Sequence, residues 1–404
     1  MRHEGLKKLV ERGLWIAGSH TLGRSALRSA GGGPIDDPRL RTDVAGLEMD
    51  GPVGLAPGWD KIGHTIQAWQ ALGAHHITLG AAPLFSQSGN PTPRLRTIDK
   101  RRGDHGTKVS QNAFGFNSRG IDQLIYNIYT QRQKEGVNIP VIVQLTVNKE
   151  FYSADLRQVI RPILVETVKR ALRLFDGVSV VDGVSIGLSS PNTQGMRTMQ
   201  DDLKLWSELI NAVGYTVKEI DPNIPLIVKG DGDGGEERLD RYAWAVEAQE
   251  RRIIDAFELI NTTRLKHILA KYGVEGLPGG LAGDDPGYKQ LALGSIRYLY
   301  ERVGGIIDII GTGGGASQAH DMIEAGASAV GINTGVRSRG LTVMRKVEQE
   351  IIERIDREHP GATALDQIVG VKTKRGPKYL AKETPEEAAA RFSKGVRTGD
   401  YRAV

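Results

Sequence analysis

Eight short apolar segments alternate along this chain with stretches of helical periodicity, and this alternation limits the folds that it can adopt. The expected strands are Val53–Ala56, His76–Leu79, Val141–Leu145, Val184–Leu188, Leu226–Val228, Phe257–Ile260, Ile307–Ile310 and Ala329–Ile332. The helical patterns between them include 120–133, 162–175, 201–217, 238–252, 294–303 and 316–325. Eight strands alternating with helices predict a (β/α)8 TIM barrel, and a doubly wound open sheet is the alternative.

Outside this alternation the chain has three distinctive regions. Residues 85–111 are polar and contain Gly89-Asn90-Pro91-Thr92-Pro93, which predicts a loop excursion or a small hairpin. Residues 1–37 read as an N-terminal amphipathic helical extension, 38–356 as the barrel, and 357–404 as a basic C-terminal extension. The segment 371–404 has nine Lys or Arg and four Asp or Glu, and so carries the whole formal charge of +5. We expect it to pack on the barrel, with contact to lipid headgroups as the alternative.

Composition excludes several kinds of chemistry. The 404 residues include no cysteine, which rules out disulfides, thiolate metal ligands and a cysteine nucleophile. The barrel itself is charge-balanced, which argues against nucleic-acid binding. No apolar run approaches the roughly 20 residues of a membrane span, and no signal peptide is recognisable. The nine histidines are scattered, and His75-His76 lacks the spacing of a two-ligand helix face, so we expect no metal site.

The N-terminal extension carries an apolar stripe at helical spacing, formed by Leu6, Leu9, Val10, Leu14 and Ala17, with Trp15 beside it. Charged residues lie between the members of the stripe. Two interpretations stay open: a helix that packs on its own domain, or a lid that touches a membrane surface or a lipid-like substrate.

Glycine-rich loops follow the last two expected strands. Gly311-Thr312-Gly313-Gly314-Gly315 comes after the seventh strand, and Asn333-Thr334-Gly335 comes after the eighth. Glycines let backbone N–H groups approach a ligand closely, and in barrels these two loops commonly bind phosphate. The pair predicts a phosphate site, against the alternative of ordinary turn chemistry.

Polar side chains follow other strands and point to one mouth of the expected barrel. Lys61 follows the first strand and Lys229 closes the fifth, and an ammonium there is costly to bury without an anionic partner. The fourth strand breaks into Ser189-Ser190-Pro191-Asn192, a polar turn that presents hydroxyl and amide groups. Asn112 and Asn261 add further amides, which both donate and accept, as recognition of a cyclic imide or amide requires. Each residue alone is more often a turn residue, and together they indicate a site.

At this point the residues resemble a known family, the dihydroorotate dehydrogenases, and specifically the membrane-associated, quinone-reducing class 2. The matching stretches lie in family order from about residue 38 to 355: 54–61, 89–95, 112–117, 189–195 with Arg197, 261–263, 279–283 and 311–314. The set together is specific, although several members are weak alone.

The resemblance implies an FMN-bound barrel that oxidises dihydroorotate to orotate in pyrimidine synthesis and passes electrons to a quinone. It makes Ser190 the catalytic base, with Lys61 between flavin and substrate and Lys229 stabilising the reduced flavin. Substrate-binding positions would be Asn112, Phe116, Asn192, Asn261 and Thr262. Cofactor-binding positions would be Ala56, Gly58, Lys61, Gln144, Lys229, Gly283, Gly313, Gly314, Thr334 and Gly335. The N-terminal helix would form the quinone entrance, with Arg94 near its inner end, and the protein would lie peripherally on the cytoplasmic side of a membrane.

Departures from the family pattern cluster at the ligands. Gly187 and Gln144 stand where the family has asparagines, and Ala81 and Ile260 stand where it has threonines. After Lys229 the family's Ala-Pro-Asp turn is replaced by Gly230-Asp231-Gly232-Asp233-Gly234. These changes leave two alternatives open: an FMN-dependent paralogue that acts on a different cyclic substrate, and a barrel that binds a phosphate ligand without turnover.

Overall fold

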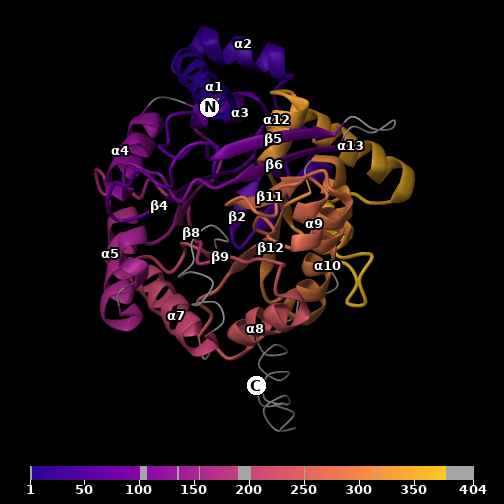
Figure 1. The fold of residues 1–404 in the computed structure, drawn as a ribbon. Coiled ribbons are helices and arrows are strands. Elements are labelled where there is room, and N and C mark those ends of the chain that lie inside the picture. The colour runs from indigo at the N-terminus through magenta and orange to yellow at the C-terminus, as the bar shows by residue number, and fades with distance from the viewer. Residues whose placement is uncertain are drawn as a thin grey trace.

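The protein folds into a closed barrel of eight parallel strands (Figure 1). The computed structural model describes residues 2–100, 107–133, 136–153, 155–189, 202–249, 251–314 and 316–378. All eight expected strands are confirmed, and they are β3 (Val53–Leu55), β4 (Ile77–Ala82), β7 (Val141–Leu145), β8 (Gly183–Ile186), β9 (Leu226–Lys229), β10 (Ala256–Leu259), β12 (Asp308–Thr312) and β13 (Ala329–Ile332). Strand β13 pairs with β3 and closes the barrel, which excludes the open sheet.

Helices surround the barrel because each expected amphipathic pattern packs one face on the strands. They are α3 (Ile66–Ala71), α4 (Ile121–Arg132), α5 (Arg161–Ala171), α7 (Leu203–Ile220), α8 (Gly235–Glu247), α10 (Pro286–Val303), α11 (Ala319–Glu324) and α13 (Val343–Glu358), with the short α9 (Lys266–Ala270) and α12 (Thr334–Arg339). Short turns of 3-10 or π helix are η1 (Pro38–Leu40), η2 (Lys149–Ser153), η3 (Leu156–Ile160), η4 (Ala316–Gln318) and η5 (Leu365–Gln367). Asp202 and Asp285 cap α7 and α10 by accepting from the N–H groups of Leu205 and Tyr288.

The bottom of the barrel is closed by the hairpin of β1 (Thr42–Val44) and β2 (Leu47–Met49). Its apolar side chains Val44, Leu47 and Met49 pack against the inward-facing residues Ile142, Ile227, Ala256, Ile310 and Ala329 of the strands. This plug buries the lower interior, so that an open cavity remains at the other end, where the strands have their carboxyl ends.

The polar excursion forms the expected hairpin, from β5 (Leu95–Lys100) and β6 (Thr107–Asn112). A third strand, β11 (Gly280–Gly283), pairs antiparallel with β6 in register Gly280↔Asn112, and the sequence analysis missed it. This small sheet lies beside the barrel mouth and brings Asn112 and Gly283 to the site.

Two helices, α1 (Arg2–Gly18) and α2 (Thr21–Gly31), precede the barrel, and α1 packs on α3 and β5. The expected stripe does not form the packed face, since Leu14 is its only fully buried member and Leu6 and Leu9 are 61% and 68% exposed. Polar residues make the contact instead: Lys7 Nζ donates to the Trp59 carbonyl at 2.8 Å, and Arg94 forms an ion pair with Glu4. The helix is therefore turned so that Leu6 and Leu9 face outward.

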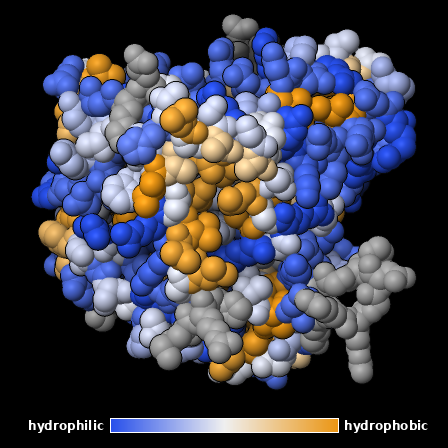
Figure 2. All heavy atoms as spheres, turned by 90° about the horizontal axis from the view of Figure 1, so that it is seen from above, coloured by the Kyte–Doolittle hydropathy of each residue, from blue (hydrophilic) through white to orange (hydrophobic). Residues whose placement is uncertain are grey.

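Figure 2 shows this outward face, where apolar residues gather. The exposed large apolar residues of α1 and α2 are Leu6, Leu9, Trp15, Ile16 and Leu22. Among the described residues, no helix is long and apolar enough to span a bilayer.

The start of the C-terminal extension packs on the lower barrel, as expected for this part. Tyr300 Oη donates to the carbonyls of Val369 and Gly376, and Lys378 Nζ forms a 2.7 Å ion pair with Asp308. The rest of the basic tail, from residue 379, lies outside the described residues. The three domain boundaries stay predictions.

Candidate active site

A cavity opens at the carboxyl ends of the barrel strands. The predicted site residues that line it are Ala56, Gly58, Lys61, Asn112, Phe116, Gln144, Lys229, Asn261, Thr262, Gly283, Gly313, Gly314 and Thr334, together with Gly187. Gly335 does not line the cavity: a Cβ there would lie 2.8 Å from a side-chain carbon of Ile332, inside the protein. Ser190 and Asn192 lie outside the described residues, so their predicted roles stay predictions.

Lys61 is positioned by a tightly hydrogen-bonded loop after β3. The buried carboxylate of Asp60 accepts from the backbone N–H groups of Ile62, Gly63 and Thr65 at 2.7–3.0 Å, which folds the loop around it. Lys61 Nζ then donates to Asn117 Oδ1 at 2.7 Å and lies 4.2 Å from the centre of the Phe114 ring. Burial, reinforced by the nearby charge of Lys7, lowers the pKa of Lys61 from 10.5 to about 7. An anionic ligand would restore the charged form.

The amide of Asn261 connects two strand ends. Its Nδ2 donates to the carbonyl and hydroxyl oxygens of Ser189 at 3.1 and 3.2 Å, and its Oδ1 accepts from the Thr262 backbone. Ser189 is the last described residue before the predicted base, Ser190, so the end of β10 contacts the chain immediately before that position. The hydroxyl of Tyr288 holds the Asn261 backbone at 3.2 Å.

The unusual turn after Lys229 supports the same strand end. Asp233 accepts from the Thr263 hydroxyl and from the Arg264 N–H, both at 2.6 Å. Asp231 accepts from the Asp233 N–H at 3.0 Å and pairs with Arg238. The two aspartates thus stabilise the turn itself and position the segment that contains Asn261 and Thr262.

Glycines at one side of the cavity leave room for a ligand close to the backbone. Gly283, Gly313 and Gly314 all have positive φ angles, of 130°, 97° and 79°. A Cβ on Gly314 would lie 1.8 Å from Gln318 Nε2, and one on Gly283 would lie 2.5 Å from the Lys108 carbonyl. These positions therefore accept only glycine without rearrangement, and they leave backbone groups accessible in the way a phosphate site requires.

The cavity also holds buried polar atoms without a hydrogen-bond partner in the structure. They include Gln144 Nε2 and Thr262 Oγ1, both of residues that line the cavity. Such atoms are costly to leave unpaired and indicate that a polar ligand belongs there. A phosphate end at the glycines and a polar ring system deeper in the barrel would satisfy both features, so the residues present fit FMN.

Sequence reasoning missed Glu258, whose side chain forms a 2.6 Å ion pair with Lys229 and is 2% exposed. It lies inside an apolar strand pattern, where the alternation alone gave no reason to single it out. Arg337 of α12 was not predicted either; it lines the cavity and stacks over Trp59 with the guanidinium carbon 4.9 Å from the ring centre. Burial lowers the pKa of Arg337 to about 10.

A second cavity lies between α1 and the barrel, and Lys61 and Phe114 line both cavities. Its wall is rich in charged residues, among them Glu4, Lys7, Glu11, Arg12 and Asp60. Lys7 and Glu11 form an ion pair there, while Arg94 pairs with Glu4 at the edge. Arg94 thus contacts the N-terminal helix directly, and its predicted place near the inner end of a quinone entrance stays a prediction.

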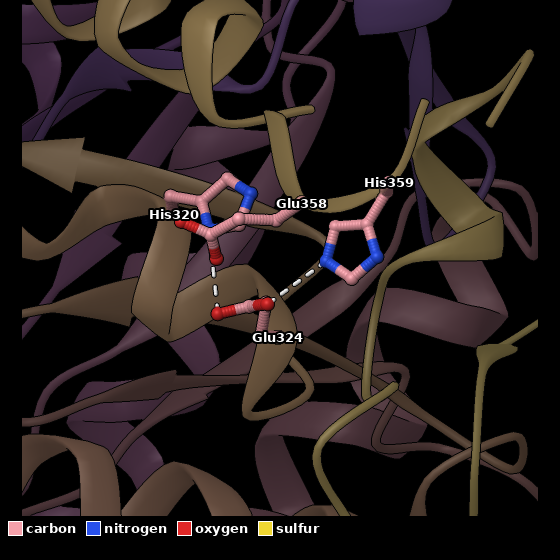
Figure 3. A group of neighbouring side chains, drawn as sticks. All are labelled: His320, Glu324, Glu358 and His359. Atoms are coloured by element: carbon pink, nitrogen blue, oxygen red, sulfur yellow. Dashed lines mark hydrogen bonds and ion pairs between the residues drawn. The ribbon is translucent and has the colours of Figure 1, made fainter. Parts of the chain in front are cut away.

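Away from the mouth, two histidines and two glutamates meet where α11 approaches the end of α13 (Figure 3). Glu324 accepts from His359 Nε2 at 2.9 Å and lies 3.3 Å from His320 Nδ1. Lys372 Nζ, at 2.7 Å, and Arg354 also contact the Glu324 carboxylate. The cations already neutralise the acids, so we interpret the cluster as an ion-pair network that anchors the C-terminal extension.

Comparison with known proteins agrees with this geometry. The family model described as "Dihydroorotate dehydrogenase" matches residues 39–355. The dihydroorotate dehydrogenase (quinone) of Bordetella avium is 32% identical over 316 residues, which cover 76% of this chain and 82% of the relative. The corresponding protein of Mycobacterium tuberculosis is 30% identical over 350 residues, covering 85% and 88%.

A solved structure shares the fold as well. The Eimeria tenella enzyme described as DHODH in complex with ferulenol superposes with a TM-score of 0.71 at 25% identity, covering 87% of this chain and 95% of that chain. The match to the family model extends over more than three quarters of the sequence. The chain belongs to the dihydroorotate dehydrogenase family.

Proposed function

We propose that this protein oxidises dihydroorotate to orotate with FMN as its cofactor and a quinone as electron acceptor. The observation that carries the proposal is the convergence of Lys61, Lys229, Asn112 and Asn261 on one cavity whose opposite side is built from glycines. Family membership and the names of the relatives support the same reaction.

Bound FMN would accept the hydride that leaves the substrate. Gly283, Gly313, Gly314 and Thr334 would hold its phosphate and ribityl chain, and Gln144 and Lys229 would contact its ring. Asn112, Asn261 and Thr262 would orient the cyclic substrate by donating to and accepting from its amide groups. Ser190 would take the substrate proton, and Asn261, bonded to Ser189, would fix the loop that presents it.

The acceptor would reach the flavin through the cavity beneath α1. The cavity and the exposed apolar face of α1 and α2 support an acceptor that arrives from a membrane surface. We therefore place the protein peripherally on the cytoplasmic side of a membrane. Removal of residues 2–31 should abolish reduction of a short-chain quinone while reduction of ferricyanide by dihydroorotate continues. Unchanged quinone reduction would refute this entrance.

The experiment that tests the main proposal is an anaerobic titration of the purified protein with dihydroorotate, followed by the visible absorption of the flavin. We expect stoichiometric bleaching. A colourless protein that cannot be reconstituted with FMN would refute the cofactor. A yellow protein that dihydroorotate does not bleach would refute the substrate and retain the cofactor.

A different cyclic substrate is the second candidate, and Gly187 is the observation that favours it. Gly187 lines the cavity without a side chain, and a Cβ there would lie only 3.2 Å from Gln144 Cδ, so Gln144 occupies the space that a side chain at this position would need. If dihydroorotate is the true substrate, Gly187→Asn should not raise its kcat/KM by more than about threefold, because recognition would not depend on a side chain at this position. A gain of tenfold or more would instead indicate a paralogue whose pocket has changed.

A further inference from the structure

The strand pairing of the barrel places a carboxylate directly behind the lysine that faces the cavity. Strands β9 and β10 are parallel, and Lys229 and Glu258 are partners in their register. Both side chains therefore point to the same side of the sheet, into the barrel. The pair is a consequence of the fold, because neighbouring in-register residues cannot be separated without shifting a strand.

The contact is close and desolvated. Lys229 Nζ lies 2.6 Å from Glu258 Oε1, and the two side chains are 10% and 2% exposed. Glu258 Oε2 has no hydrogen-bond partner in the structure. Among the described residues, Glu258 is the one carboxylate within ion-pair distance of Lys229.

The two partners differ in what they face. Lys229 lines the cavity, whereas Glu258 is not part of its wall. A ligand in the cavity therefore meets a lysine whose charge is already balanced from behind. In a low-dielectric interior that compensation is strong, because a counter-ion at contact distance cancels most of the field of the cation.

We propose that Glu258 tunes the flavin of this protein by neutralising Lys229, so that the oxidised form is favoured more than an unpaired lysine would allow. The inference rests on FMN binding as proposed above. A two-electron reduced flavin is anionic when its ring is ionised, and an unpaired cation beside the ring would stabilise that form. The Lys229–Glu258 pair withdraws part of that stabilisation, so the reduction potential of the flavin is lower.

The test measures the flavin itself, without dihydroorotate. Sulfite adds reversibly to oxidised flavin and leaves a negative charge on the ring, so its affinity reports the field at the ring. In holoprotein, Glu258→Gln should tighten sulfite binding by about tenfold or more and raise the midpoint potential, since a tenfold change corresponds to about 30 mV for a two-electron couple. A sulfite affinity within twofold of that of the wild type, together with an unchanged midpoint potential, would overturn the proposal.

Two further variants keep the test decisive if Glu258→Gln loads FMN poorly. Lys229→Met leaves the carboxylate uncompensated and should weaken sulfite binding by about tenfold or more. Adding Glu258→Gln to that variant should then return the affinity toward that of the wild type, because the site is again neutral. A double variant as weak as Lys229→Met would overturn the proposal.

Glu324→Gln is the matched control. Glu324 is also buried, at 1% exposure, and also paired with a lysine, but it belongs to α11 outside the barrel. Its replacement should leave sulfite affinity and potential unchanged, and an equal shift in this variant would contradict a local effect of Glu258. If dihydroorotate fails to bleach the flavin but these shifts appear, the proposed substrate is wrong and this inference stands. A protein that takes up no FMN overturns both.

Discussion

Replacement of Lys61 by methionine should stabilise the ligand-free protein while it removes activity. Lys61 is held between two cavities, with Asn117 as its hydrogen-bond acceptor and no carboxylate within ion-pair distance among the described residues. Burial lowers its pKa in the folded protein to about 7, from the ordinary lysine value of 10.5. Burial of Lys61 therefore opposes folding at every pH at which this side chain is protonated in the unfolded chain.

The size of this unfavourable free energy follows from how far the pKa of Lys61 is lowered. A difference of 3.5 pKa units corresponds to about 5 kcal/mol of unfavourable free energy at pH values below 7, at about 1.4 kcal/mol per unit. Water can enter both cavities, and methionine would leave Asn117 Oδ1 without its donor, so the net gain is smaller. We expect Lys61→Met to raise the free energy of unfolding by about 1–3 kcal/mol at pH 6.

The sign of the pH dependence makes the reasoning testable. Between pH 7 and 10.5 the unfolded chain holds a proton on Lys61 that the folded protein has released, so wild-type stability rises with pH in this window. The gain in free energy of unfolding from Lys61→Met should therefore be largest below pH 7 and should decrease toward pH 10. Urea denaturation of the apoprotein at pH 6 and pH 9.5 measures both values.

The exposed Lys346 of α13 gives a matched control, since Lys346→Met removes the same charge at the surface. That change should alter stability by no more than about 0.5 kcal/mol at either pH. A Lys61→Met protein that is less stable than wild type at pH 6, or whose gain does not depend on pH, would refute the account.

Three other variants test separate parts of the structure. Burial alone would raise the pKa of Glu324, but hydrogen bonds from His320, Lys372 and His359 outweigh it and lower the pKa to about 2. Glu324→Gln should therefore lower the free energy of unfolding by about 2 kcal/mol at pH 7. In urea titrations the difference in stability from the wild type should shrink as pH falls from 4.5 through 2. Gly314→Ala should weaken FMN binding by at least about tenfold in equilibrium dialysis, because its Cβ would overlap Gln318 and its φ of 79° disfavours a side chain. Leu6→Asp with Leu9→Asp should abolish sedimentation with vesicles of phosphatidylglycerol and phosphatidylcholine without changing the thermal midpoint, since both side chains are exposed; unaltered sedimentation would contradict a membrane role for this face.

Much of the barrel could be predicted from the sequence because its signals are local. A strand buried on both faces is a short apolar run, and a covering helix has its own periodicity, so each element can be recognised without its neighbours. The glycine-rich turn after β12 could be predicted for the same reason, because a few adjacent residues are enough to indicate it. The strand β11 was missed because Gly280-Leu281-Ala282-Gly283 has little strand character, and only pairing with β6 makes it one.

The orientation of α1 shows a different limit. The stripe of Leu6, Leu9 and Leu14 predicted an amphipathic helix correctly, yet periodicity cannot say which face meets the protein. The rim of the barrel offers Arg94 and the Trp59 carbonyl, so the polar residues Glu4 and Lys7 face inward, while Leu6 and Leu9 face outward.

The sequence by itself therefore determined the fold class, the loops that carry the site, and the residue types that converge at the barrel mouth, because these depend on local pattern and on the order of the strands. The tertiary structure alone decided how charges are paired. Glu258 meets Lys229, and Glu324 meets His359 and Lys372, through strand register and helix packing between segments distant in sequence. An ion pair requires contact at a few ångströms, and the folding of the chain brings these residues to that distance, so no pattern along the chain could assign these partners.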